Sequence, residues 1–346
     1  MPNGDLPLQM FREYRSALDQ MMFFAQFAAP GDIAFCVGAG GAGKSRLAKL
    51  IGPMVYGGSG TWAPGTRPFV LVQLDTPDRA YFSPKAFIRD CLLCLDDPFR
   101  AGVENIATWP LAPEIKERLI RITSVQSPRS YGEPEMRIAF INLARLLGVK
   151  LLLVDEANMM TLTQVNRTPT DYLESLRRLG DRIGCPVILL GTIRLLKLLG
   201  HSAQLNRRTF RVHLARMSCR DEVGAMQFLS FVKGIEEAYK LDSGLLTGQV
   251  AAVHEWTYGI PGEVVGLVDR ARIYAAAEGS AIEWRHMQKA QHLPEALKRM
   301  VAEADIIEST MEGTPEPEAP PEKTKKPKKA RRNMKAKRTP NGGYAH

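Results

Sequence analysis

Four short apolar runs alternate along the chain with longer segments in which apolar positions recur at helical spacing. The runs cover residues 32–37, 69–74, 149–154 and 185–190. Runs of this length that are apolar almost throughout predict strands buried on both faces, as in a parallel sheet. The helical segments among them are 83–95, 133–147 and 170–183. We therefore expect an α/β fold, with a parallel sheet covered by helices on both faces.

The pattern changes on either side of this alternating region. Residues 6–27 precede the first strand and predict one or two helices with an apolar face. After Met217 the pattern becomes wholly helical. The helical segments there are 221–239, about 245–257, 262–277 and 284–290. They predict a smaller α-helical domain that ends near residue 306.

The C-terminal residues have a different composition from the rest of the chain. Residues 311–346 are rich in Pro and Glu and then in Lys and Arg, which cannot bury a core, so we expect disorder. The expected organisation is a helical segment at 1–30, a sheet-containing core at 31–217, a helical lid at 218–306 and a disordered tail at 307–346.

The net charge of +9 comes from this tail. Residues 323–338 contain ten Lys or Arg and no Asp or Glu, and subtracting these ten from the 46 basic residues leaves 36 against 37 acidic ones. No run of 18 apolar residues occurs, and the N-terminus lacks a basic region followed by an apolar one. We therefore expect no membrane span and no secretory signal.

The five cysteines, an odd and scattered set, predict a reducing environment and a cytoplasmic protein. Cys91 and Cys94 form the only C-x-x-C pair. Without a second pair or a nearby histidine, we interpret them as thiols that face the core rather than as zinc ligands.

A glycine-rich loop follows the first predicted strand and fits the G-x-x-x-x-G-K-[ST] pattern of nucleotide hydrolases. The loop consists of Gly38, Ala39, Gly40, Gly41, Ala42, Gly43, Lys44 and Ser45, and Arg46 continues it into a predicted helix. Glycines allow backbone N–H groups to surround phosphates, and the helix N-terminus adds partial positive charge. Lys44 would contact the β- and γ-phosphates of ATP and Ser45 would bind Mg²⁺. The preceding helix then packs on the core or also lines an adenine pocket.

Two carboxylates end the strand at 149–154, about 110 residues after the loop. Asp155 at a strand end can hold Mg²⁺ directly or through water, and Glu156 can polarise an attacking water. The simpler interpretation is a pair of acids that cap a helix. The preceding phosphate loop favours the catalytic interpretation.

Further polar groups follow the next strand. Thr192 comes directly after the strand at 185–190 and can sense a γ-phosphate, or can belong to an ordinary turn. Arg207, Arg208 and Arg211 lie close together farther along. Arginine suits bidentate contact with phosphate, including that of a neighbouring subunit, although a solvated basic turn explains these residues equally well.

Together these motifs resemble an AAA+ ATPase, and in finer detail the TnsC/TniB family of transposition regulators. The segments that carry the finer resemblance are 151–157, 176–179, 186–192 and 204–209, with weaker support from 259–262 and the region of Trp284. The resemblance implies a P-loop AAA+ parallel-sheet core, a smaller C-terminal α-helical lid and ATP-dependent DNA binding.

The family resemblance also implies roles for individual residues. Ser45 and Asp155 would serve Mg²⁺, Glu156 hydrolysis, and Thr192 the first sensor. Arg207 or Arg208 would act as an arginine finger on a neighbour's nucleotide. Family members form rings or filaments on double-stranded DNA, receive a target-selection protein and activate a transposase.

In one respect the sequence departs from the AAA+ pattern. Many AAA+ lids carry an arginine shortly after the glycine that begins the third lid helix, but Gly262 is followed by Glu263, Val264, Val265 and Gly266. The family pattern therefore gives no clear second-sensor arginine here.

The DNA-contacting surface is predicted only from related assemblies, in which loops after the second strand face the pore. This comparison points to Arg79, Lys85 and Arg89, whose simpler interpretation is solvated charge. A signalling or defence NTPase switch that does not act on DNA is an alternative function, although the basic tail favours DNA. A P-loop kinase is disfavoured because no acceptor-substrate site is visible.

Overall fold

A computed structural model describes residues 10–76, 81–95, 112–117, 132–163, 168–198 and 209–312. Within them, five parallel strands form one sheet in the order β2-β3-β4-β1-β5. The strands are β1 (Ile33–Val37), β2 (Phe69–Gln73), β3 (Leu151–Asp155), β4 (Val187–Gly191) and β5 (Thr209–His213). Every residue of β1, β3 and β4 is buried, which explains why these strands are apolar except for Asp155 at the end of β3.

The fifth strand was not among the four strands predicted from apolar runs. β5 lies at the edge of the sheet and pairs only with β1. Val212 is its one fully buried residue, and Phe210 and Arg211 are exposed. A partly exposed edge strand does not need a continuous apolar sequence. The polar residues of β5 therefore give no apolar run from which the strand could be predicted.

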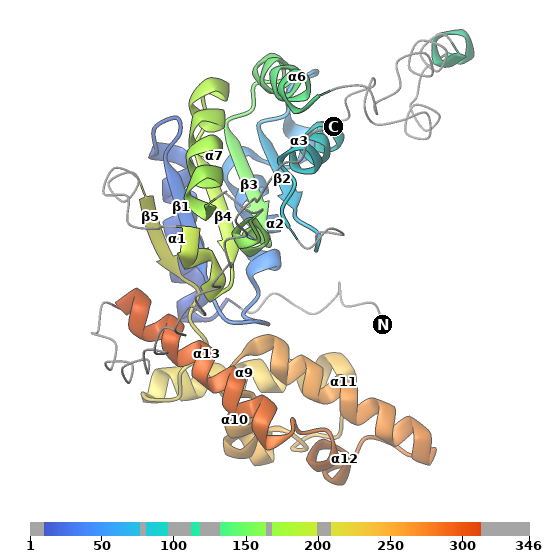
Figure 1. The fold of residues 1–346 in the computed structure, drawn as a ribbon. Coiled ribbons are helices and arrows are strands. Elements are labelled where there is room, and N and C mark those ends of the chain that lie inside the picture. The colour runs from blue at the N-terminus through green and yellow to red at the C-terminus, as the bar shows by residue number, and fades with distance from the viewer. Residues whose placement is uncertain are drawn as a thin grey trace, which may run out of the picture.

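Helices cover both faces of the sheet, as expected (Figure 1). On one face α1 (Arg12–Phe27) and α2 (Lys44–Tyr56) pack with the side chains of Cys36, Leu153 and Leu190. The opposite face is covered by α3 (Pro84–Cys94), α6 (Glu133–Leu146) and α7 (Pro169–Ile183), which pack on Phe35, Val154 and Leu189. Because the side chains of a strand alternate between faces, each central strand contributes to both cores.

Short 3-10 turns follow three of the strands or helices of this core. They are η1 (Ser59–Thr61), η3 (Ala157–Thr161) and η4 (Ile193–Leu198). Residues 52–68 are dense in Gly and Pro, so their sequence predicts a loop. This prediction is wrong at its start, because α2 continues through Pro53 to Tyr56. Gly52 is required there, since a Cβ would lie 2.5 Å from the ring of Phe69.

The C-terminal helices lie beyond the carboxyl ends of the strands (Figure 1). They are α9 (Glu222–Tyr239), α10 (Val250–Thr257), α11 (Pro261–Glu278), α12 (Trp284–Lys289) and α13 (Pro294–Glu312), with the turn η5 (Thr247–Gln249) before α10. The helix α13, which the sequence did not predict, crosses the expected lid boundary at residue 306 and returns to the core beside β5 and η4. None of the helices within the described ranges has the length and apolarity needed to span a membrane.

Candidate functional site

The predicted phosphate loop connects the carboxyl end of β1 to the start of α2. Gly41 and Gly43 have φ angles of 76° and 97°, in the left-handed region that residues with a Cβ rarely adopt. A Cβ on Gly38 would lie 2.8 Å from the carbonyl oxygen of Leu214. The Gly38 N–H donates to the Gly191 carbonyl over 3.2 Å. The loop is therefore fixed beside the ends of the central strands β1 and β4.

Lys44 is a buried cation held against this loop. Its side chain is only 6% exposed. Nζ donates to the carbonyl oxygens of Gly38, over 3.0 Å, and Ala39, over 2.7 Å. Burial lowers the pKa of Lys44, and among the groups that oppose this shift the carboxylate of Glu156 is the strongest. A buried ammonium with mainly neutral hydrogen-bond partners can bind an anion such as a phosphate oxygen.

The two predicted carboxylates lie across from Lys44 at the end of β3. Asp155 is 3% exposed, and its Oδ1 accepts a hydrogen bond from the Glu156 N–H over 2.9 Å. Glu156 has a φ of 54°, which turns the chain sharply into η3. Such a conformation is uncommon for a residue with a side chain and often occurs at functional sites. The turn leaves Glu156 partly exposed while Asp155 stays buried.

Asn158 is a site residue that the sequence interpretation missed. It lies in η3 and is 7% exposed. Its Oδ1 accepts a hydrogen bond from the Thr192 N–H over 3.3 Å, so it joins the turn after Glu156 to the end of β4. A signal was present, because Asn158 is the one polar side chain in the apolar sequence 157–160.

The helix α1 also reaches the phosphate loop. Tyr14 is buried, and a Cβ on Gly43 would lie 3.2 Å from its ring. The Tyr14 hydroxyl is buried without a hydrogen-bond partner in the described part of the chain, and burial raises its pKa to about 12. The leading helix therefore packs on the loop as well as on the sheet. Its role beside an adenine base stays a prediction.

The C-terminal helical region contacts the phosphate loop directly through two glycines. The Gly262 N–H, at the start of α11, donates to the Gly41 carbonyl over 2.9 Å. A Cβ on Gly262 would lie 2.7 Å from that oxygen and 2.8 Å from the Gly41 Cα. Glu263 follows and pairs with His292 over 2.6 Å. Arg270, the first arginine of α11, donates instead to the Ala290 carbonyl inside the lid.

We expect the substitution Gly262→Ala to displace the lid from the loop, because the added methyl group meets backbone atoms that cannot rotate away. Nucleotide affinity should fall about tenfold, equivalent to about 1.4 kcal/mol, as measured by equilibrium binding of a fluorescent ATP analogue. Gly266→Ala is the matched control, since its Cβ would approach only the flexible Arg270 side chain. Equal affinity of the two variants would contradict a role for the Gly41–Gly262 contact.

The returning helix α13 adds charge beside the same site. Glu303 is among the carboxylates that raise the pKa of Lys44. Farther along α13, Asp305 accepts a hydrogen bond from the Tyr258 hydroxyl over 2.5 Å, and Glu308 pairs with the buried Arg216 over 2.8 Å. The guanidinium of Arg216 also lies 3.8 Å from the centre of the Tyr258 ring. These contacts hold α13 between the core and the lid.

For five of the predicted site residues, the described structure shows no contact with this arrangement or does not describe the residue at all. Arg207, Arg208 and Arg79 lie outside the described residues. Lys85 and Arg89 are exposed on α3, where Arg89 pairs with Asp90 over 3.1 Å.

The cysteine pair lies on α3. Cys91 is buried, and the Cys94 thiol lies 3.4 Å from the Leu71 carbonyl. No group of three or more His, Cys, Asp or Glu that could hold a metal is found in the described ranges.

Comparison with known proteins agrees with this architecture. Residues 108–219 match the family described as Bacterial TniB protein. No curated protein matches the chain.

Several solved structures share the fold. The Walker-type ATPase PABY2304 of Pyrococcus abyssi has a TM-score of 0.52 and 17% identity, over 90% of this chain and 80% of that one. The Aeropyrum pernix ORC2 protein in its ADP form has a TM-score of 0.51 and 13% identity, over 83% and 70%. The Aeropyrum pernix ORC1 protein in complex with DNA has a TM-score of 0.54 and 12% identity, over 84% and 67%.

The strand order 2-3-4-1-5 with a C-terminal helical region is shared with AAA+ ATPases, so the predicted fold class is confirmed. The match over residues 108–219 confirms the finer resemblance predicted from the sequence. The chain therefore has the fold of a Walker-type AAA+ ATPase and the sequence resemblance to TniB that its motifs predict.

Proposed function

We propose that this protein is an ATP-dependent DNA-binding regulator of DNA transposition that hydrolyses ATP. The observation that carries the proposal is the grouping of Lys44, Asp155, Glu156 and Thr192 at one edge of the sheet, under a lid that contacts the phosphate loop. Catalysis of ATP hydrolysis needs a cation for the phosphates, a carboxylate for Mg²⁺ and a base for water, and these residues supply all three.

The residues present fit a magnesium nucleotide. The buried Asp155 carboxylate accepts one hydrogen bond from the Glu156 N–H, and Ser45 is the second residue of α2, directly after the buried Lys44. Ser45 and Asp155 would hold Mg²⁺, and the loop from Gly38 to Arg46 would bind the phosphates. The ion would offset phosphate charge. Glu156 would orient water, and Asn158 would hold the Thr192 backbone in place.

Sequence similarity and the basic tail support action on DNA. The TniB match connects the chain with transposition, and a relative of the same fold has been solved in complex with DNA. We propose that the protein assembles on target DNA in the bacterial cytosol and connects a target-selection protein with the transposase. Lys85 and Arg89, with Arg79, are the proposed DNA contacts of the core.

Assembly of several copies is the second part of the proposal. Phe23 and Phe27 on α1 are 63% and 69% exposed, with ring centres 4.7 Å apart. Phe210 on the edge strand is 38% exposed and stacks on Phe24. Exposed aromatic groups of this kind mark protein contacts. Phe210 follows Arg208 by two positions, so a copy docked there would lie near the proposed arginine finger.

If Arg207 or Arg208 acts on a neighbour's nucleotide, its Ala variant should bind ATP as a monomer and lose hydrolysis by about a thousandfold. Mixing it with a Lys44→Ala variant should restore part of the activity, because hybrid interfaces combine one intact finger with one intact phosphate loop. ATP turnover measured across mixing ratios tests this. Once sedimentation has shown that the variants co-assemble, complete absence of rescue would exclude a finger acting in trans.

Truncation after Glu322 should weaken DNA binding and leave its ATP requirement intact. The ten basic residues of 323–338 carry charge without a folded surface, so their contribution should be electrostatic and independent of sequence. If about four of them neutralise phosphates, the slope of log K against log salt should flatten by roughly 3 to 4 units on truncation.

The measurement is DNA affinity of both forms from low to high salt, with and without ATP. Identical salt slopes for the two forms would show that the tail does not contact DNA. Loss of all ATP-dependent binding would show that the tail, rather than the core, is the principal DNA-binding element.

A signalling or defence switch that uses the same ATPase core without DNA is the alternative. Both functions require the nucleotide site. Only the proposed function requires that the ATP-bound protein binds duplex DNA.

A further inference from the structure

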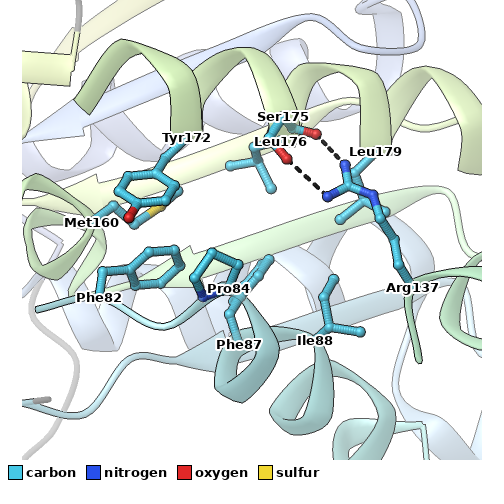
Figure 2. Close-up of a pocket in the computed structure, with 10 residues that line it drawn as sticks. All are labelled: Phe82, Pro84, Phe87, Ile88, Arg137, Met160, Tyr172, Ser175, Leu176 and Leu179. Atoms are coloured by element: carbon cyan, nitrogen blue, oxygen red, sulfur yellow. Dashed lines mark hydrogen bonds between the residues drawn. The ribbon is translucent and has the colours of Figure 1, made fainter. Parts of the chain in front are cut away.

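An apolar crevice lies on the face of the core that carries α3 and α7, apart from the phosphate loop (Figure 2). Phe82 and Phe87 line one side, Met160 of η3 lies at one end, and Leu176 of α7 covers the other side. Its enclosed space is only about 20 Å³, below a mouth that opens to solvent. This is far too small for a whole cofactor or a drug-sized ligand, so the crevice suits at most the tip of a single side chain.

One end of the crevice is aromatic and carries an unsatisfied hydroxyl. Tyr172 is 3% exposed and meets Phe82 edge to face, with ring centres 5.0 Å apart. The Tyr172 hydroxyl is buried and lacks a hydrogen-bond partner in the described part of the chain. The aromatic walls favour an apolar ligand group at this end of the crevice.

The opposite end is formed by a half-buried arginine. Arg137 donates to the Ser175 hydroxyl over 2.8 Å and to the Ser175 carbonyl over 2.5 Å (Figure 2). Within the described ranges it forms no ion pair with a carboxylate. Burial lowers its pKa, the carboxylate of Glu133 opposes that shift, and the positive charges of Arg182 and Arg178 add to it. The guanidinium is therefore a partly desolvated cation with neutral partners.

The neighbouring acidic groups are already engaged. Glu174 pairs with Arg177 over 3.0 Å and with Arg178 over 3.1 Å, and Asp181 pairs with Arg177 over 2.5 Å. Arg182 is exposed and, like Arg137, forms no ion pair with a described residue. At this end of the crevice the Arg137 cation is therefore hydrogen-bonded to neutral groups, and the Glu133 carboxylate acts on it without forming an ion pair.

We propose that this crevice binds an acidic peptide segment of a partner protein, which inserts one apolar side chain between Phe82 and Leu176 and places a carboxylate on Arg137. The apolar walls select the inserted side chain, and the cationic rim selects the acidic flank. A nucleic acid backbone would satisfy the arginines but would leave the apolar walls uncovered. The chemistry of both ends together therefore favours a peptide.

The site is connected to the catalytic turn through η3. Met160 lines the crevice, while Asn158 in the same turn holds the Thr192 backbone and Glu156 precedes it directly. The Phe82 N–H also donates to the Leu162 carbonyl just after η3, over 2.7 Å. A side chain inserted against Met160 would contact η3 and could shift the turn that positions Glu156. This coupling rests on the proposed ATPase function, whereas the binding itself does not.

Fluorescence anisotropy with the full-length protein tests the binding. The probe is a labelled hexapeptide, Gly-Asp-Asp-Leu-Asp-Gly, and two control peptides replace Asp with Lys or Leu with Ser. We expect the probe to bind at least about tenfold more tightly than either control, since one charge-assisted hydrogen bond or one buried side chain supplies that difference.

Three variants test whether the probe binds in the crevice. Arg137→Gln should weaken probe binding about tenfold, whereas Arg145→Gln, an exposed arginine of the same helix, should change it less than about twofold. Ser175→Leu keeps the positive charge and fills the crevice, and should also weaken binding. Thermal unfolding of each variant verifies that it is folded.

Several results would overturn the proposal. One is the absence of probe binding up to about 1 mM, and another is equal binding of the Leu and Ser peptides. A third is an equal effect of Arg137→Gln and Arg145→Gln on probe binding. The last is a short oligothymidylate that binds more tightly than the probe and depends on Arg137. Probe binding that leaves ATP turnover unchanged would overturn the coupling through η3. Because anisotropy needs no ATP hydrolysis, failure of the peptide site and failure of the ATPase function can be distinguished.

Discussion

Replacement of Lys44 with alanine is expected to abolish ATP binding, with a loss of affinity of at least about 100-fold. The Lys44 ammonium is buried against the loop carbonyls of Gly38 and Ala39. Its removal leaves the phosphate charge without this buried cation beside the loop. Isothermal titration with ATP and Mg²⁺ measures the loss directly.

The matched control for this variant is Lys49→Ala, which removes an exposed lysine from the same helix. It should bind ATP with wild-type affinity. If Lys44→Ala and Lys49→Ala bound ATP equally well, the loop would not be the phosphate site.

The second large effect is expected for Glu156→Gln, which should retain ATP binding and lower turnover by about 100- to 1,000-fold. Glutamine has nearly the same shape but cannot accept a proton, so the loss should fall on the chemical step, where general-base catalysis typically contributes 10²–10⁴-fold, that is about 3 to 5 kcal/mol. Phosphate release at saturating ATP measures turnover, and nucleotide titration measures binding.

Glu255→Gln is a suitable control, because Glu255 is exposed on the lid helix α10. Wild-type turnover by Glu156→Gln would mean that another group activates water. A loss of ATP binding instead would show that Glu156 supports the nucleotide rather than the reaction.

The parts of the fold that depend on local sequence could be predicted. The strands β1, β3 and β4 are buried on both faces, so each is a continuous apolar run. The phosphate loop is a contiguous motif, and Asp155 and Glu156 directly end β3. Parallel strands bring their carboxyl ends to one edge, which explains why the grouping of these residues follows from the order of the elements.

The parts that depend on contacts between distant segments could not be predicted. The Gly41–Gly262 contact joins residues more than two hundred positions apart, and no spacing rule identifies the second glycine. The return of α13 to the core depends on ion pairs such as Arg216–Glu308. The edge strand β5 was missed because only Val212 of its five residues is fully buried.

Filter binding of random duplex DNA by the full-length protein, with ATP, with ADP and without nucleotide, tests most directly whether ATP controls DNA binding. We predict tight binding with ATP, and binding weaker by at least about tenfold in the other two conditions. Glu156→Gln should hold DNA in the ATP state, and Lys44→Ala should not respond to ATP. Equal affinity of the wild-type protein for DNA in all three conditions would show that ATP does not control DNA binding.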